Sequence, residues 1–446
     1  MRKRLRSAVG LALALAACSG PPAPHVVLVT ADALRADHLS LYGYPRQTSP
    51  RLDAFARDAS VFAQAISVIP KTAPSFATIF TGRHPEVHGV RSNFASLPAE
   101  LPLLPERLRA AGYRTAAFVS NPALGEAKGF ARGFDVYRML PADDGVAQVN
   151  RAFLAFAEEP WSRPTFVWLH YIDPHGPYQP PLAYEELFLG DEWSRQPARV
   201  PRGYDTGGFG NKVLGAVPGY QQRADGEDRV AAYVARYDAE IRYVDDAFGE
   251  VLDTLRAKGV FDAAAIVFTS DHGESLGEHD VYFEHGWFAY DSCLRVPLVI
   301  KAPGQRGGRA SEAPVSNLDL LPTLLGLAGV PSPDAGGADL LREPAPADPI
   351  LVESSDRYPE KFHGARTPRW KYLRRESDGR EELYDLTADP AETRNLAASQ
   401  ADARRQLADF TAARRAELRR AAAARPEEAP VDPATLDQLR RLGYVE

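Results

Sequence analysis

The segment from Pro70 to Asn93 reads PKTAPSFATIFTGRHPEVHGVRSN. Proline is unfavourable inside a regular helix, so Pro70 and Pro74 predict a constrained turn that presents Thr72 ahead of the apolar run Phe76 to Phe80. A hydroxyl at the start of a helix lies beside free backbone N–H groups, which favour an anionic ester. The segment therefore predicts a nucleophile loop followed by a helix. The alternative is that Thr72 only caps the helix, which is common for threonine.

Four apolar runs along the chain end in polar residues that can take part in chemistry. Residues 25–31 end at Asp32, residues 115–119 at Ser120 and Asn121, residues 165–169 at His170, and residues 265–269 at Ser270, Asp271 and His272. Runs of this kind are typical of buried parallel strands. Ligands of open α/β sheets bind beyond the carboxyl ends of the strands, so the four endings predict one site.

Helical patterns separate these runs. The clearest covers Val230 to Leu255, where apolar residues recur every three or four positions, and others cover residues 103–111, 146–156 and 317–328. Alternating strands and helices predict an α/β fold with a mostly parallel central sheet and helices on both faces. Short strand patterns at residues 350–352, 370–374 and 382–386 predict a small C-terminal α+β subdomain.

The chain divides into segments of different character. We expect a signal peptide at residues 1–17, a tether at 18–24, a catalytic domain at 25–345, a C-terminal subdomain at 346–400 and a helical tail at 401–446. Within the catalytic domain, residues 183–228 lack periodicity and are rich in Gly, Pro, Arg and Tyr. Long irregular segments in compact domains are often functional, so this insertion is a candidate lid.

The N-terminus carries basic residues followed by a short apolar run, Ala8 to Ala17, as in signal peptides. The run ends in Leu15-Ala16-Ala17-Cys18, which resembles a bacterial lipobox with Cys18 as the lipidated residue. We therefore expect a lipoprotein of the bacterial cell envelope, attached to the outer membrane and facing the periplasm or the surface. Ordinary secretion with a free cysteine is the alternative.

The overall charge limits the choice of partners. The net charge of −7 argues against a general nucleic-acid binder, because neutralising phosphates needs concentrated Lys and Arg. An anionic substrate would have to be held by a local site.

Several of these motifs together resemble the sulfatase family of the alkaline phosphatase superfamily. The resemblance rests on T-x-P-S at Thr72, on TGRHPEVHGV after it, on Asp271-His272-Gly273-Glu274, and on LYDLTADPAETRNL in the C-terminal part. Sulfatases carry C-x-P-x-R or S-x-P-x-R at the first motif, where the Cys or Ser becomes formylglycine. This chain has Thr72 and Phe76 at those positions, and threonine cannot give that aldehyde.

The resemblance implies one divalent metal ion, which could be calcium, manganese or zinc. Its expected ligands are Asp32, Asp271 and His272, with Thr72 completing the set, because carboxylates suit hard cations and an imidazole widens the choice. Many sulfatases have two adjacent aspartates at the first position, but Ala33 follows Asp32 here. Asp37 is a possible substitute.

The resemblance also assigns roles to further residues. His170, Asp173 and His175 lie in HYIDPHGPY, which is similar to a substrate-contacting loop, and His285 falls near the family's leaving-group residue. The mechanism we infer is in-line displacement at sulfur or phosphorus by Thr72, with His285 or His175 as the acid. Donors to the non-bridging oxygens would be Lys71 and Asn93.

The sequence thus predicts a metal-dependent hydrolase of sulfate esters or, more in keeping with Thr72, of phosphate or phosphonate esters. The substrate would be an anionic ester of a glycan, lipid or small molecule, and the membrane would be reached through the lipid anchor. Two alternatives remain open. One is an envelope phospho- or phosphoethanolamine transferase, and the other is a pseudo-sulfatase that only binds anionic glycans.

Overall fold

The computed structural model describes residues 23–200, 217–223, 226–344, 347–356, 360–422 and 426–445. The predicted lipidation site Cys18 and part of the predicted lid lie outside these ranges. None of the helices within them combines the length and the apolar character that crossing a membrane requires.

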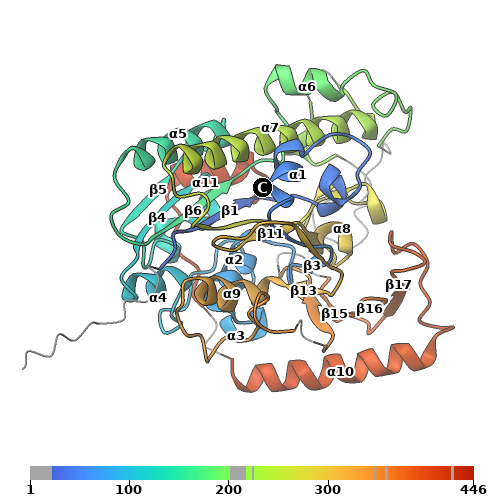
Figure 1. Cartoon of the computed structure of the whole chain (residues 1–446). Coiled ribbons are helices and arrows are strands. Elements are labelled where there is room, and N and C mark those ends of the chain that lie inside the picture. The colour runs from blue at the N-terminus through green and yellow to red at the C-terminus, as the bar shows by residue number, and fades with distance from the viewer. Residues whose placement is uncertain are drawn as a thin grey trace, which may run out of the picture.

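An eight-stranded sheet forms the centre of the molecule, in the order β12-β2-β11-β7-β1-β6-β4-β5 (Figure 1). The strands are β1 (Val26–Ala31), β2 (Ser60–Phe62), β4 (Arg114–Val119), β5 (Val136–Met139), β6 (Thr165–Tyr171), β7 (Ala265–Ser270), β11 (Leu298–Lys301) and β12 (Arg309–Ser311). The pairs that join β7, β1, β6, β4 and β5 are all parallel, whereas β11 runs antiparallel to β7 and β2. The predicted fold class is confirmed.

Helices cover both faces of this sheet, as Figure 1 shows. On one face lie α1 (Pro50–Ala56), α5 (Gly145–Glu158) and α7 (Val230–Ala257), and on the other lie α2 (Thr72–Thr81), α4 (Leu104–Ala110) and α9 (Leu320–Leu327). Alternate residues of β1 divide between the two cores: Val27 and Val29 pack with the α7 side, and Val26 and Leu28 with the α2 side. Burial on both faces explains why β1 is continuously apolar.

Helix α2 differs from the sequence prediction in one respect. Pro74 was expected to exclude helix, yet it is the third residue of α2. The first turn of a helix tolerates proline because its N–H groups have no partner within the helix. Thr72 is therefore the first residue of the helix itself, not part of a separate turn before it.

A second sheet of four antiparallel strands follows, in the order β14-β15-β16-β17. Its strands are β14 (Ile350–Glu353), β15 (Phe362–Arg366), β16 (Trp370–Arg375) and β17 (Glu381–Asp385), with α10 (Ala401–Arg420) packed along it. The sequence did not predict β15, in which Gly364 and charged residues break the apolar pattern.

The last helix, α11 (Pro433–Arg441), returns to the central sheet. Leu439, Leu442 and Tyr444 are buried there against Ala123 and Ile172, which follow β4 and β6. The end of the chain therefore lies beside the carboxyl ends of the central strands.

The smaller elements connect these layers. They are α3 (Pro85–His88), α6 (Leu182–Phe188), α8 (Asp291–Leu294), and the short strands β3 (Ala65–Ile66), β8 (Ser275–Leu276), β9 (Tyr282–Glu284), β10 (Arg295–Val296) and β13 (Val315–Ser316).

Candidate active site

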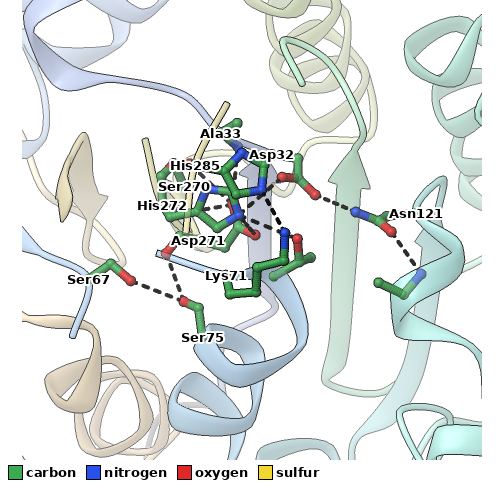
Figure 2. A network of polar contacts seen from close by, with 12 residues as sticks. Asp32, Ala33, Ser67, Lys71, Ser75, Asn121, Ser270, Asp271, His272 and His285 are labelled. Atoms are coloured by element: carbon green, nitrogen blue, oxygen red, sulfur yellow. Dashed lines mark hydrogen bonds and ion pairs between the residues drawn. The ribbon is translucent and has the colours of Figure 1, made fainter. Parts of the chain in front are cut away.

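The site lies at the carboxyl ends of the central strands, where the sequence predicted it. Asp32 follows β1 and Asp271 with His272 follows β7, the strand hydrogen-bonded to β1. Helix α2 points its N-terminus at them and is held there by the Ser75 hydroxyl, which donates to the backbone carbonyl of Asp271 at 2.7 Å. Figure 2 shows these side chains gathered above the start of that helix. Residues more than two hundred positions apart are thus brought into one cluster.

Asp32, Asp271 and His272 form a group that could hold a metal ion. One ligand atom from each lies within 4.8 Å of the others, and all three side chains are fully buried. His272 Nε2 is 3.5 Å from Asp32 Oδ1 and 3.3 Å from Asp271 Oδ2. His272 Nδ1 donates to the carbonyl of Gly273 at 2.9 Å, which leaves the Nε2 lone pair directed at the carboxylates.

The electrostatics of this group fit a cation. Within the described part of the chain, Asp32 Oδ1 and Asp271 Oδ2 are buried without hydrogen-bond partners. Burial raises the pKa of Asp32 to about 7, although the Asn121 amide donates to it. Burial and the neighbouring Asp32 raise the pKa of Asp271 well above its usual value. Two buried carboxylates with orphaned oxygens are costly unless a positive charge lies between them, so the donor set fits a divalent metal.

Thr72 begins α2 beside this group. Its Oγ1 lies 3.4 Å from His272 Nε2, and the side chain is fully buried. The backbone next to it is fixed because Ala73 N donates to Asn93 Oδ1 at 3.0 Å. The hydroxyl therefore lies at the positive end of a helix and beside the metal-ligand group, in a position suited to attack on an anionic ester.

Lys71, His285 and Glu274 form a buried row next to Thr72. Lys71 Nζ donates to His285 Nε2 at 3.2 Å, and His285 Nδ1 donates to Glu274 Oε1 at 3.1 Å. The row fixes the imidazole tautomer and links the lysine to a carboxylate. His285, predicted as a leaving-group acid, contacts Lys71 and also lies against the ring of His272, with the two centroids 4.2 Å apart.

Lys71 and Asn93 line a cavity of about 210 Å³ together with Arg91 and Tyr444. Asn93 Nδ2 is buried and has no hydrogen-bond partner among the residues that the structure describes. A donor without a partner at a cavity wall is suited to an oxygen of a bound ester.

The three polar residues of the loop after β6 occupy different places. His170 Nε2 is 3.3 Å from Asp32 Oδ2, and its Nδ1 contacts Thr30 Oγ1 at 2.9 Å, so His170 positions the carboxylate. His175 donates from Nδ1 to the Gly176 carbonyl at 2.6 Å and keeps an unpartnered, buried Nε2. Burial lowers the pKa of His175 to about 3, so the imidazole is neutral at neutral pH.

Asp173 faces α7 and not the metal-ligand group. Its carboxyl interacts with that of Glu240, and burial raises the pKa of both groups. The pair lines a second cavity of about 1070 Å³, which also reaches His175 and α11. This larger space could take the rest of a substrate whose reacting group lies at Thr72.

Comparison with known proteins places the chain in a family. The family model described as Sulfatase matches residues 24–330, which is more than half of the chain. The chain belongs to the sulfatase family. It is therefore a sulfatase-like ester hydrolase, and the group Asp32, Asp271 and His272 provides a possible site for the metal on which sulfatase-family enzymes depend.

Relatives of this sulfatase-family chain act on different esters. It is 28% identical to the ulvan-active sulfatase of Formosa agariphila, over 84% of this chain and 77% of that protein. It resembles the phosphonate monoester hydrolase of Silicibacter pomeroyi with a TM-score of 0.69 and 25% identity, covering 89% of this chain and 95% of that one. It also shares its fold with a protein solved in complex with its substrate D-glucosamine-2-N,6-O-disulfate. The TM-score is 0.74 and the identity 22%, covering 89% of this chain and 98% of that one.

Sequence reasoning did not assign three further residues of the site. Glu274 was part of the quoted Asp271-His272-Gly273-Glu274 motif, and its place beside His285 could have been proposed from that. Asn121, noted as a strand ending, donates to Asp32 and to Tyr444. Tyr444 reaches the site from α11, and no local pattern indicated this contact. Asp37, considered as a substitute ligand, forms an ion pair with Arg35 at 2.8 Å instead.

Proposed function

We propose that the chain hydrolyses phosphodiesters or phosphonate monoesters through a covalent intermediate on Thr72. The observation that carries the proposal is the Thr72 hydroxyl 3.4 Å from His272 Nε2, at the position where formylglycine sulfatases have their nucleophile. A divalent metal held by Asp32, Asp271 and His272 would lower the cost of deprotonating this hydroxyl and would neutralise charge on the ester.

In the first step the Thr72 oxygen, having lost its proton to water, forms a bond to phosphorus as the bond to the leaving oxygen breaks. Lys71 donates a proton to the leaving oxygen, and the row to His285 and Glu274 orients its ammonium group. Asn93 Nδ2 donates to a non-bridging oxygen. Lys71 and Asn93 both line the cavity of about 210 Å³, and Lys71 directly precedes Thr72 in the chain.

In the second step water attacks phosphorus and the bond to Thr72 breaks. The threonine oxygen takes up a proton from solvent water, and so does Lys71, which lost its own proton in the first step. The neutral His175, with its unpartnered Nε2, accepts the proton of the attacking water. At neutral pH it carries no proton to give to the leaving group, so we assign it to this step, after which it releases the proton to solvent.

The identity of the nucleophile favours phosphorus over sulfur. A formylglycine hydrate releases sulfate by collapsing to the aldehyde, whereas a threonine sulfate must be attacked again at sulfur. A phosphothreonine turns over by ordinary in-line attack of water. The likeness to the phosphonate monoester hydrolase of Silicibacter pomeroyi supports the same preference.

The test is kcat/KM on matched p-nitrophenyl sulfate, phosphate monoester, phosphodiester and phosphonate substrates, each with calcium, manganese and zinc. We expect phosphodiester or phosphonate turnover to exceed sulfate turnover, Thr72→Ala to abolish it, and Thr72→Ser to keep part of it. A clear preference for the sulfate would overturn the proposal.

A further inference from the structure

Tyr444 approaches Thr72 from outside the central sheet. Helix α11 carries it there, docked by Leu439 and Leu442 against Ala123 and Ile172. Leu439 is fully buried and Tyr444 is 2% exposed. Gly443 makes the turn from the helix with a φ of +71°, and a Cβ there would lie 2.2 Å from the Tyr220 ring. The packing of α11 and of Gly443 therefore holds Tyr444 next to Thr72.

The phenol of Tyr444 makes two polar contacts at the site. Its oxygen lies 2.9 Å from Asn121 Nδ2 and 3.3 Å from Thr72 Oγ1. The orientation of the Asn121 amide is fixed by its oxygen, because Ala123 N donates to Asn121 Oδ1 at 2.8 Å. Asn121 Nδ2 is therefore the donor and the phenol oxygen the acceptor, so the phenol proton remains available toward Thr72.

The ring of Tyr444 is also fixed in place. Lys71 Nζ lies 4.8 Å from its centroid, and the His175 ring meets it nearly edge-on with the centroids 5.1 Å apart. These contacts leave the ring little freedom to turn, and the hydroxyl is held at one position beside the nucleophile.

We propose that Tyr444 is a catalytic residue, whose neutral phenol donates a hydrogen bond to a non-bridging oxygen of the ester as Thr72 attacks. The inference rests on the proposed function in taking Thr72 as the attacking atom. The phenol keeps its proton throughout, so the bonds and protons of the two steps are unchanged. With Lys71 and Asn93 it completes three donors that line the same cavity of about 210 Å³.

A simple plug is the competing interpretation, in which Tyr444 only blocks the site. Two observations favour the donor. The cavity with Lys71 and Asn93 on its wall persists with Tyr444 in place. The Asn121 amide also donates to both the phenol oxygen and Asp32, a candidate metal ligand, so one side chain positions both groups.

The experiment compares Tyr444→Phe and Tyr444→Ala with wild type in the full chain. Removing one donor to a developing oxyanion lowers kcat by about 100-fold to 1000-fold, so we expect Tyr444→Phe to lose about 100-fold in kcat with a smaller change in KM. Tyr444→Ala should lose at least as much. A change below threefold in Tyr444→Phe, or a gain of activity in Tyr444→Ala, would overturn the proposal.

Tyr113→Phe is the matched control, because Tyr113 is equally buried and its hydroxyl bonds to the carbonyl of Pro24 away from the site. It should keep wild-type kcat. Should Tyr444→Phe fail to fold, Leu439→Ala undocks α11 without touching the site. We expect it to lose activity, and a gain would again favour a plug.

Calorimetric binding of tungstate separates this inference from the proposed function, because a tetrahedral oxyanion needs no turnover. We expect about tenfold weaker binding in Tyr444→Phe than in wild type or Tyr113→Phe. If wild type hydrolyses none of the esters, the proposed function fails and tungstate still tests Tyr444. Equal binding in all three proteins, or tighter binding in Tyr444→Ala, would contradict the donor role.

Discussion

Replacing Asp32 by Asn should stabilise the metal-free protein while removing its response to metal. Burial raises the pKa of Asp32 from 3.8 to about 7, so the folded state binds the proton more tightly than the unfolded state. The resulting destabilisation grows as the pH rises from about 4 to about 7 and is complete above that range. At about 1.4 kcal/mol per pH unit it approaches about 4 kcal/mol at pH 8 and about 2 kcal/mol at pH 5.

The Asn variant carries no such charge, and its amide oxygen can still accept from Asn121. For 446 residues, an unfolding entropy of about 2 cal/mol/K per residue converts these values into an increase in Tm of about 4 °C at pH 8 and about 2 °C at pH 5. Metal should stabilise the wild type and leave the variant unchanged. Wild type gains about 3 kcal/mol at a metal concentration one hundred times Kd, and Asp32→Asn gains none.

The assay is calorimetric melting of both proteins after chelator treatment, at pH 5 and pH 8, with and without added manganese. Asp245→Asn is the control, since burial raises the pKa of Asp245 to about 7 as well, but its carboxylate accepts from the backbone N–H groups of Arg51 and Leu52. That variant should keep the full metal response. A metal-free Asp32→Asn protein less stable than wild type at pH 8, or one that manganese still stabilises fully, would refute the reasoning.

Three further outcomes are expected. Cys18→Ser should release the protein from membranes, and cell fractionation in which the wild type is wholly soluble would contradict the lipid anchor. Phe76→Ala should cost about 3 to 5 kcal/mol in urea unfolding, because the buried ring packs on Phe80 and Trp168 and a cavity would remain. Asn93→Ala should lower kcat/KM by about 100-fold through the lost donor, and a loss below threefold would remove Asn93 from the site.

The central part of the fold was accessible from the sequence because its signals are local and strong. Continuous apolar runs such as the one before Asp32 indicate buried parallel strands, and the spacing in residues 230–255 indicates a helix. Strand endings then located the cluster of Asp32, Asp271 and His272, since carboxyl ends of parallel strands share one edge.

Contacts made through tertiary packing were not accessible in this way. Tyr444 reaches Thr72 only because α11 docks on residues that follow β4 and β6. The sequence of residues 436–444 indicates that this segment folds back on the core, but not where it docks. The prediction that Pro74 excludes helix was wrong, because the effect of a proline depends on whether it falls in the first turn of the helix. Asp173 was grouped with its neighbours His170 and His175, but its side chain points to Glu240 on α7.

The packing of Phe76 has a consequence for the evolution of this chain. Its fully buried ring lies against Phe80, Trp168 and the edge of His170, at the position where the formylglycine motif has arginine. An arginine introduced there would bury its guanidinium among aromatic rings, which costs several kcal/mol unless a carboxylate pairs with it. A mutation of Thr72 to cysteine alone would restore only half of the motif. Return to formylglycine chemistry thus requires replacement of both Thr72 and Phe76, and the second replacement also disturbs the aromatic packing around it.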